Sequence, residues 1–264
     1  MMQFEQIRNF FPPALKDSPA HQKYILKEYL QLLILDFLTT TPAIRKLALI
    51  GGTNLRLCKG IDRFSEDLDF DCKGLTREEF MDMTDAIIVY LQRSGWHVKP
   101  GDKPSDKLTA FRRSLYFPEL LFDLGLSGYK EERFLIKVES EDQQINYKPV
   151  MARIKGCGMF FSFPVPDDPV LCAMKISALL SRHKGRDFYD CMFLLGQTQP
   201  DYSFLEARWG IRDLAELKTA LANRLNVVNL SHRVKDFEHL LFQKTNSKTI
   251  LLMADFIASL RLTP

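Results

Sequence analysis

Two aspartates separated by one residue are the part of the sequence best suited to chemistry. Asp67 and Asp69 flank Leu68, in a run to Asp71 that alternates acidic and apolar residues. This period of two predicts a strand on which both carboxylates project from one face, while Leu68 and Phe70 point into the core. Like charges held this close repel, and a divalent cation between them relieves the repulsion. Mg²⁺ prefers oxygen ligands and shares them with substrate phosphates. The alternative is a solvated acidic strand at a sheet edge.

A glycine pair lies upstream of these aspartates. Gly51, Gly52 and Thr53 precede Asp67 by 14 to 16 residues and follow the apolar segment 47–50, which predicts a short strand. We expect Thr53 to cap the first turn of the helix that follows. Glycine lets the backbone approach a phosphate closely, and the amides at a helix N-terminus attract anions. The order strand, glycine pair, helix, paired aspartates therefore predicts a phosphate site beside a metal site, although the chain has no G-x-x-x-x-G-K-[ST] loop.

A third group of residues is basic. Lys175 and Arg182 are seven residues apart in a segment with helical periodicity, so we expect them to share a helix face, and Arg186 and Asp187 follow Gly185. Residues 148–186 hold seven Lys or Arg and two Asp or Glu, a net charge of +5 in a chain whose total is +3. Such a cluster suits recognition of a triphosphate. The alternative is a solvated basic face.

The elements that position these residues follow from periodicity and capping. The predicted fold is α+β: a mixed sheet with helices, followed by a helical C-terminal region. The predicted domains are residues 1–166, with an N-terminal helix, and residues 167–264, which carry Lys175 and Arg186–Asp187. Residues 200–264 are expected to be mostly helical. Helices are predicted over 21–39, over 76–93, where Thr76 and Glu79 form a capping box, and over 168–183, where Asp168 is the cap. A further helix is predicted to begin at Asp187. The predicted strands cover residues 47–50, 67–71, 108–117, 133–139 and 160–165.

The composition narrows the class of protein. The chain has 264 residues, of which 46% are hydrophobic and 26% charged, and its net charge of +3 excludes a polybasic protein. No apolar run approaches the ~20 residues that cross a bilayer, and the N-terminus lacks the pattern of a secretory signal. The five cysteines form no C-x-x-C pair, so the ligands of any metal should be carboxylates. We expect a cytoplasmic protein that binds no membrane.

Two runs of sequence carry a resemblance to a known family. The first joins Leu49–Leu57 to Arg63–Phe70, and the second joins Lys175–Leu179 and Arg182 to Arg186–Asp190. Together they resemble the motifs of the AbiEii/AbiGii-type nucleotidyltransferase toxins, members of the polymerase-beta-like nucleotidyltransferase superfamily. The resemblance covers roughly residues 20–200 and implies a polymerase-beta-like nucleotidyltransferase core.

The resemblance also implies roles for individual residues. A later strand supplies a third carboxylate in the superfamily; Glu139 is the candidate here, and Asp123 is the alternative. Residues matching Lys175 and Asp187 are needed for activity in the family, and Asp187 would either orient a neighbouring cation or act on the acceptor. The implied metal ligands are Asp67, Asp69 and Glu139, and the implied nucleotide-binding residues are Gly51, Gly52, Thr53, Arg56, Ser65, Lys175, Arg182 and Arg186.

The activity implied by the resemblance is metal-dependent transfer of a nucleoside monophosphate from an NTP to an acceptor, with release of pyrophosphate. The implied cofactor is Mg²⁺ or Mn²⁺. The implied partners are a tRNA or other RNA acceptor and a cognate antitoxin, because the family consists of toxins of bacterial toxin–antitoxin or phage-defence systems. Two alternatives stay open: transfer to a protein or a small molecule, and a non-catalytic nucleotide-binding module.

Overall fold

The computed structural model describes residues 3–101 and 110–261 of the chain. The chain forms two compact units: the first holds the chain up to Gly60 and Phe64–Val165, and the second holds Ile61–Arg63 and the chain from Pro166 onward. The segment Ile61–Arg63 therefore interrupts the first unit in sequence. Within the described ranges, no helix is both long and apolar enough to span a membrane.

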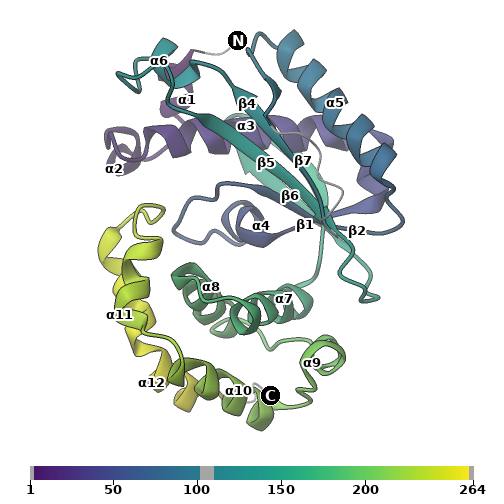
Figure 1. Cartoon of the computed structure of the whole chain (residues 1–264), viewed down its shortest axis with the longest axis vertical. Helices are drawn as coiled ribbons and strands as arrows, with labels where there is room; N and C mark the ends of the chain where they lie inside the picture. Colours follow the sequence, from purple (N-terminus) through teal and green to yellow (C-terminus); the bar gives the residue numbers. More distant parts are fainter. Residues whose placement is uncertain (1–2, 102–109, 262–264) are drawn as a thin grey trace. The chain divides into compact units, whose positions relative to one another are not determined.

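A five-stranded mixed sheet organises the first unit (Figure 1), and the predicted α+β class is confirmed. The strand order is β1-β2-β5-β4-β3, with β2 and β5 parallel and the other neighbours antiparallel. The strands predicted over 47–50, 67–71 and 133–139 are confirmed. Of the strand predicted over 108–117, residues 111–117 form a strand, and residues 108 and 109 lie outside the described residues. The bounds are β1 Leu47–Ile50, β2 Leu68–Cys72, β3 Lys99–Pro100, β4 Phe111–Phe117 and β5 Phe134–Glu141.

Helices cover this sheet. The predicted helix over 21–39 is α3, Gln22–Thr39, an apolar helix that contacts α5, Arg77–Arg93, within the first unit (Figure 1). The capping box of α5 is confirmed: the Glu79 amide donates to Thr76 Oγ1 at 3.2 Å, and the Thr76 amide donates to Glu79 Oε2 at 2.9 Å. The other helices of this unit are α1 Phe4–Arg8, α2 Pro13–Lys16, the 3₁₀ helix η1 Pro42–Lys46, α4 Gly51–Cys58 and α6 Leu120–Asp123.

A separate antiparallel pair of strands, β6 Val150–Gly156 and β7 Met159–Val165, completes the first unit. Strand β7, predicted over 160–165, packs against α3 and β1, and β6 packs against α4. The ring of Phe163 in β7 lies 5.9 Å from that of Phe70 in β2. Strand β6 was not predicted, because its side of the pair is mostly exposed and lacks a buried apolar run.

The second unit is helical, and the prediction that residues 200–264 are mostly helical is confirmed as far as residue 261; residues 262–264 lie outside the described residues. Asp167, one residue earlier than predicted, caps α7: its Oδ1 accepts from the Val170 amide at 3.1 Å. Helix α7 packs against α8 and α9. The elements are α7 Asp168–Ser181, α8 Gly185–Leu195, α9 Tyr202–Trp209, α10 Leu214–Asn226, α11 Leu230–Arg233, the 3₁₀ helices η2 Val234–Asp236 and η3 Lys244–Leu252, and α12 Met253–Ser259.

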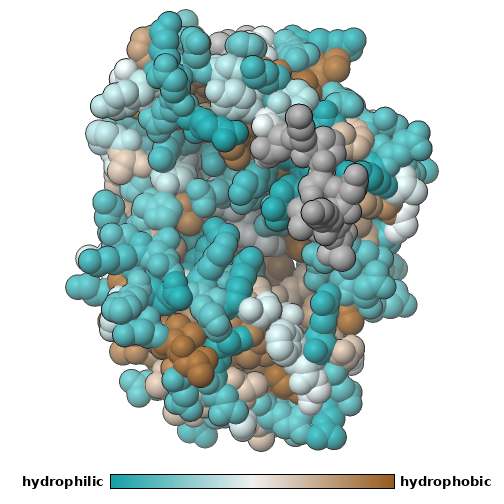
Figure 2. Space-filling model, viewed as in Figure 1, coloured by the Kyte–Doolittle hydropathy of each residue, from teal (hydrophilic) through white to brown (hydrophobic). Residues whose placement is uncertain are grey.

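The surface of the second unit carries some apolar side chains. Val227, Leu251 and Leu252 are exposed, at 71%, 45% and 57% of their full surface. On the face drawn in Figure 2, hydrophilic residues predominate, and a hydrophobic patch lies over the C-terminal helices. Exposed apolar residues are common on globular proteins, so these three do not by themselves mark a binding site.

Candidate active site

Asp69 lies at the junction of three elements of the first unit. In β2 it is paired with Ile50 of β1 on one side and with Glu139 of β5 on the other. Gly51, the first residue of α4, follows Ile50 directly, so the helix begins beside the Asp69 carboxylate. The predicted neighbours Gly51, Asp69 and Glu139 are therefore brought together by the pairing of β2 with β1 and β5.

Gly51 has a specific structural role at this junction. Its φ of +73° is a backbone conformation that favours glycine, and a Cβ built on it would collide with Oδ2 of Asp69. The absence of a side chain thus lets the Asp69 carboxylate lie against the start of α4. Partial positive charge at a helix N-terminus favours an anion there. Gly51 and Asp69 form one structural feature, although they lie 18 residues apart in the sequence.

Thr53 does not cap α4, and the prediction that it would is wrong. Helix α4 begins two residues earlier, with Ile50 at the N-cap and no side chain bonded there. Thr53 is buried inside the first turn, where its Oγ1 lies 2.9 Å from Ser65 Oγ and 2.5 Å from the Asp67 carbonyl oxygen. The Thr53 hydroxyl therefore ties α4 to the segment that leads into β2 and fixes the backbone at Asp67.

The surroundings of Asp67 favour the neutral form of its carboxyl group. Burial raises its pKa above the ordinary value, and the nearby carboxylates Glu66 and Glu139 raise it further, while Lys137 and Lys27 act in the opposite direction. An acid that is partly buried near other acids is stabilised by an added positive charge. This surrounding fits a cation beside Asp67.

Glu139 has a cationic partner on the neighbouring strand. Arg112 of β4 is paired with it in register, and the Arg112 Nε lies 2.7 Å from Glu139 Oε1. Asp123, the alternative third carboxylate, is in the short helix α6 and outside the sheet. Within the described residues, no three Asp, Glu, His or Cys side chains form a group that could hold a metal ion. The strand pairing brings Asp69 beside Glu139, which Arg112 neutralises, and Asp67 lies one residue before β2.

Lys27 and Lys137 are cations of the first unit that the sequence did not single out for phosphate binding. Burial lowers the pKa of Lys27, and the charges of Glu66 and Asp67 oppose that effect. Lys137 precedes Glu139 by two residues on β5. Arg56, predicted to contact phosphate, instead pairs with Glu28 of α3, with its Nε 2.7 Å from Oε2. Helix α3 also carries Lys23, Glu28 and Asp36, so nothing in its sequence distinguished Lys27.

The second unit contains a buried ionic cluster formed by Lys175, Asp190 and Arg63. Asp190 is fully buried; its Oδ2 lies 2.8 Å from Lys175 Nζ and 2.7 Å from Arg63 Nη2. Burial alone would raise the pKa of Asp190, but the two cations outweigh burial and hold that pKa at about 2. Asp190 was not predicted as a site residue. The sequence feature that could have identified Asp190 is its spacing of three residues from Asp187, which places the two acids on one face of α8.

Arg182 and Asp187 form a second pair. Arg182 lies past the end of α7 in an extended conformation, so the prediction that it shares a helix face with Lys175 is wrong. Its guanidinium makes two hydrogen bonds of 2.9 Å with the buried carboxylate of Asp187. Arg186 is half-buried in the first turn of α8. Lys175 and Asp187 are thus both engaged in ion pairs within the second unit.

Asp62 anchors the segment Ile61–Arg63 in the second unit. The Tyr189 hydroxyl donates to Asp62 Oδ1 at 2.6 Å, and Asn246 Nδ2 donates to Asp62 Oδ2 at 2.7 Å. The backbone amide of Phe242 also donates to the Asp62 carbonyl, at 3.0 Å. Together with Arg63 and Asp190, these bonds hold the three residues that precede Phe64, Ser65 and Asp67 in the chain.

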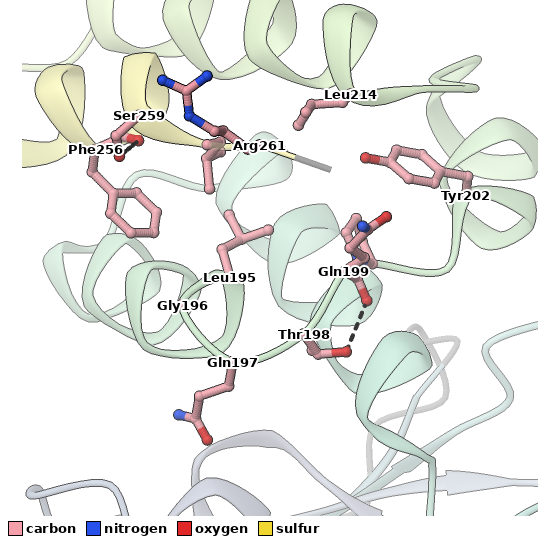
Figure 3. A pocket seen from close by; sticks show the side chains of 12 residues that line it. Leu195, Gly196, Gln197, Thr198, Gln199, Tyr202, Leu214, Phe256, Ser259 and Arg261 are labelled. Atoms are coloured by element: carbon pink, nitrogen blue, oxygen red, sulfur yellow. Dashed lines mark hydrogen bonds between the residues drawn. The ribbon is translucent and has the colours of Figure 1, made fainter. Parts of the chain in front are cut away.

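A pocket of about 340 Å³ lies in the second unit (Figure 3), and none of the predicted site residues lines it. Figure 3 shows side chains from the end of α8, the start of α9 and α10, and α12 around it. It holds no acidic side chain and no cluster of reactive groups among its lining residues, so it has no evident catalytic chemistry. The lining residues are Leu195, Gly196, Gln197, Thr198, Gln199, Pro200, Tyr202, Leu214, Phe256, Ser259, Leu260 and Arg261.

Comparison with known proteins gives one family and several similar folds. The model of the nucleotidyl transferase AbiEii toxin family, of type IV toxin–antitoxin systems, matches residues 34–259. The structure resembles MenT4, a nucleotidyltransferase toxin from Mycobacterium tuberculosis, with TM-score 0.60 and 17% identity over 99% of this chain and 91% of that chain. It also resembles JHP933 from Helicobacter pylori, with TM-score 0.55 and 19% identity over 89% of this chain and 90% of that chain. No curated protein matches.

Proposed function

The chain belongs to the AbiEii family of nucleotidyl transferase toxins, and from this premise we propose that it transfers a nucleoside monophosphate from an NTP to an RNA acceptor. The acceptor hydroxyl oxygen bonds to the α-phosphorus, the bond from that phosphorus to the β-bridging oxygen breaks, and pyrophosphate leaves. Such a reaction depends mainly on positioning and on charge stabilisation. The observation that carries the proposal is the junction at which Gly51, Asp69 and Glu139 meet.

Asp67 and Asp69 are the residues that would hold a divalent cation, Mg²⁺ or Mn²⁺. Burial raises the pKa of Asp67 against the opposing charges of Lys137 and Lys27, and this supports the assignment because a bound cation would favour the ionised carboxylate. When bound, the cation supplies neutralisation of the triphosphate charge. Glu139 remains the proposed third carboxylate; it pairs with Arg112, which would have to release it for Glu139 to bind a cation.

The phosphates of the NTP are proposed to lie at the N-terminus of α4. The amides of Gly51, Gly52 and Thr53 begin that helix, and Lys27 and Lys137 lie near enough to Asp67 to affect its pKa. Arg56, through its pair with Glu28, is assigned to holding α4 against α3. Ser65, through its contact with Thr53, is assigned to fixing the same helix.

The second unit is proposed to contribute in two ways. Lys175 joins Asp190 and Arg63 in the ionic cluster, so we assign it to fixing the segment that leads into Ser65 and Asp67. Arg182 and Arg186 are proposed to add positive charge for the nucleotide. Asp187 orients Arg182 through the two hydrogen bonds between them.

The acceptor and the partner are proposed from the family. The family name describes a toxin of a toxin–antitoxin system, so a cognate antitoxin is the expected protein partner. A tRNA is the proposed acceptor. Transfer to a protein or a small molecule is the second candidate, because the same carboxylates would serve a different acceptor hydroxyl.

The experiment uses the purified chain, total RNA, a divalent cation and each of the four NTPs in turn, labelled at the α-phosphate. We expect label in an RNA band of tRNA size with at least one NTP. Label on protein would favour the second candidate. No transfer with any NTP and either Mg²⁺ or Mn²⁺ would contradict the proposed activity, and γ-labelled NTP is the control because its label leaves with pyrophosphate.

A further inference from the structure

The β6–β7 pair of the first unit has one exposed face of distinctive composition. Its register pairs Met151 with Pro164, Arg153 with Ser162, and Lys155 with Phe160. Ile154 and the alternate residues Phe161, Phe163 and Val165 are buried, so the opposite side chains face outward. We call the exposed residues Met151, Arg153, Lys155, Phe160 and Ser162 the ribbon face.

The charge of this face has one sign. The whole segment 143–166 contains Lys148, Arg153 and Lys155 and no aspartate or glutamate. Arg153 and Lys155 are exposed and lie two residues apart on β6, so both project from the ribbon face. A surface with cations and no acids attracts a polyanion.

Phe160 supplies a second kind of contact. Its side chain is 68% exposed, an unusual exposure for a large aromatic ring, and its cross-strand partner is Lys155. An exposed ring beside cations can stack on an unpaired base while the cations contact the adjoining phosphates. A base within a duplex is already stacked and offers no such face, so the chemistry favours a single strand.

The ribbon face belongs to the same unit as the proposed catalytic carboxylates. Strand β6 packs against α4, and α4 begins at Gly51 beside Asp69. An RNA held by the ribbon face is therefore held by an element that supports the phosphate-binding helix.

We propose that the ribbon face binds a single-stranded segment of the acceptor RNA, with Arg153 and Lys155 on phosphates and Phe160 stacked on a base. This inference rests on the proposed function, because it names the surface that receives that acceptor. The competing occupant is an acidic protein partner, which would contact the cations but has no base to stack on Phe160. The effect of Phe160→Ala on single-stranded RNA separates the two occupants.

The test measures binding of a fluorescent single-stranded RNA of about 12 nucleotides to the full chain, without NTP, from about 50 to about 200 mM salt. Arg153→Gln with Lys155→Gln should reduce the slope of log affinity against log salt by about 1.4, because each lost single-strand phosphate contact contributes about 0.7. Phe160→Ala should weaken binding about 5-fold or more at every salt concentration, without changing the slope. The same Phe160→Ala change should leave binding of a duplex of that sequence unaltered.

Matched control variants come from elsewhere in the chain. Tyr129→Ala removes an exposed aromatic side chain of the first unit, and Lys244→Gln with Lys248→Gln removes two exposed cations of the second. Both controls should bind RNA as the wild type does. Equal slopes for the ribbon-face and Lys244/Lys248 variants, or wild-type affinity of Phe160→Ala for the single strand, would overturn the inference. Because binding is measured without NTP, failure of transfer by the wild-type chain counts against the proposed function alone.

Discussion

At the scale of single residues, Asp69 and Asp71 make an informative pair. Both lie on the same face of β2, yet Asp71 is buried and accepts hydrogen bonds from the Gln143 amide at 2.8 Å and from the Tyr147 hydroxyl. Asp69 is half-buried and lies against Gly51 near other acids. The same residue type therefore has a structural role at one position and the proposed catalytic role at the other.

The two acids should respond differently to neutralisation. Asp69→Asn removes a negative charge that lies across from Glu139, so the thermal midpoint without divalent cation should stay the same or rise. Asp71→Asn weakens charge-assisted hydrogen bonds in a buried position and should lower the free energy of unfolding by about 1.5–3 kcal/mol. Thermal and urea unfolding of both variants checks this. A larger loss of stability for Asp69→Asn than for Asp71→Asn would contradict the account.

Gly51→Ala tests the close approach of α4 to Asp69. Alanine at this positive φ costs about 1 kcal/mol or more in backbone strain, and its Cβ would also displace the Asp69 carboxylate. Gly125→Ala is the control, because Gly125 has a φ of +68° with no atom within 4 Å of an added Cβ. Gly51→Ala should lose at least as much stability as Gly125→Ala, while nucleotidyl transfer falls by at least about 10-fold in Gly51→Ala alone. Equal transfer by the two folded variants would argue against the Gly51–Asp69 feature.

The sequence was sufficient to predict that Gly51 and Asp69 lie together, because the glycine pair and the alternation of acidic and apolar residues mark the two positions. The sequence could not predict the charge partners of three residues: Arg112, Lys27 and Asp190. Each acts through a partner that is far away in sequence: Arg112 through strand pairing, Lys27 through helix packing, and Asp190 through Arg63, 127 residues away. Single-residue chemistry was therefore easier to predict than the pairing of charges.

At the scale of elements, α7 and α8 are joined by the ionic cluster of Lys175, Asp190 and Arg63. Removing one partner from a buried ion pair leaves an uncompensated charge and costs about 3–5 kcal/mol. The cluster also holds the segment before Phe64 through Arg63. The stability of the second unit should therefore depend on the charge of all three side chains.

The depressed pKa of Asp190 makes the stability of the second unit depend on acid pH. Asp190 has a pKa of about 2 in the folded chain, against an ordinary value of 3.8. This difference adds about 2 kcal/mol to the free energy of unfolding at neutral pH. This contribution is fully present above about pH 4 and is lost as the pH falls toward 2, because protons then bind the unfolded state first. Urea unfolding across that range should show the fall.

Two variants isolate the contribution of Asp190. Asp190→Asn removes the titrating group, and Lys175→Met removes one of its cations while leaving the pair with Arg63. In both, stability should fall less steeply than in the wild type between about pH 4 and pH 2. A wild-type slope in a folded Lys175→Met protein would contradict the assigned cause of the low pKa.

Elements were predicted best where the local pattern decides them. The capping box of α5, the strands β1 and β2 and the proline-started helix α7 all have strong local signals. Strand β6 has only a weak local pattern of apolar residues, because Met151, Arg153 and Lys155 face solvent and only Ile154 is fully buried. Helix α7 ends at Ser181, which places Arg182 outside the helix that periodicity extended to residue 183.

At the scale of the whole molecule, the charge is distributed unevenly. The net charge is +3, but the segment 143–166 carries three cations and no acid. Around Asp67, by contrast, the acids Glu66 and Glu139 lie among the cations Lys27 and Lys137. A local surplus of cations such as that of 143–166 attracts polyanions even though the net charge of the whole chain is small.

The most direct test of the central claim compares nucleotidyl transfer by Asp69→Asn and Asp71→Asn, two isosteric changes on one face of one strand. With labelled NTP, divalent cation and total RNA, at a temperature where both variants are folded, Asp69→Asn should lose at least about 100-fold of the transfer rate. Asp71→Asn should remain within a few-fold of the wild type, because its carboxylate contacts Gln143 and Tyr147. Near-wild-type transfer by Asp69→Asn, or equal loss in the two folded variants, would contradict the assignment of Asp67 and Asp69 as the catalytic carboxylates.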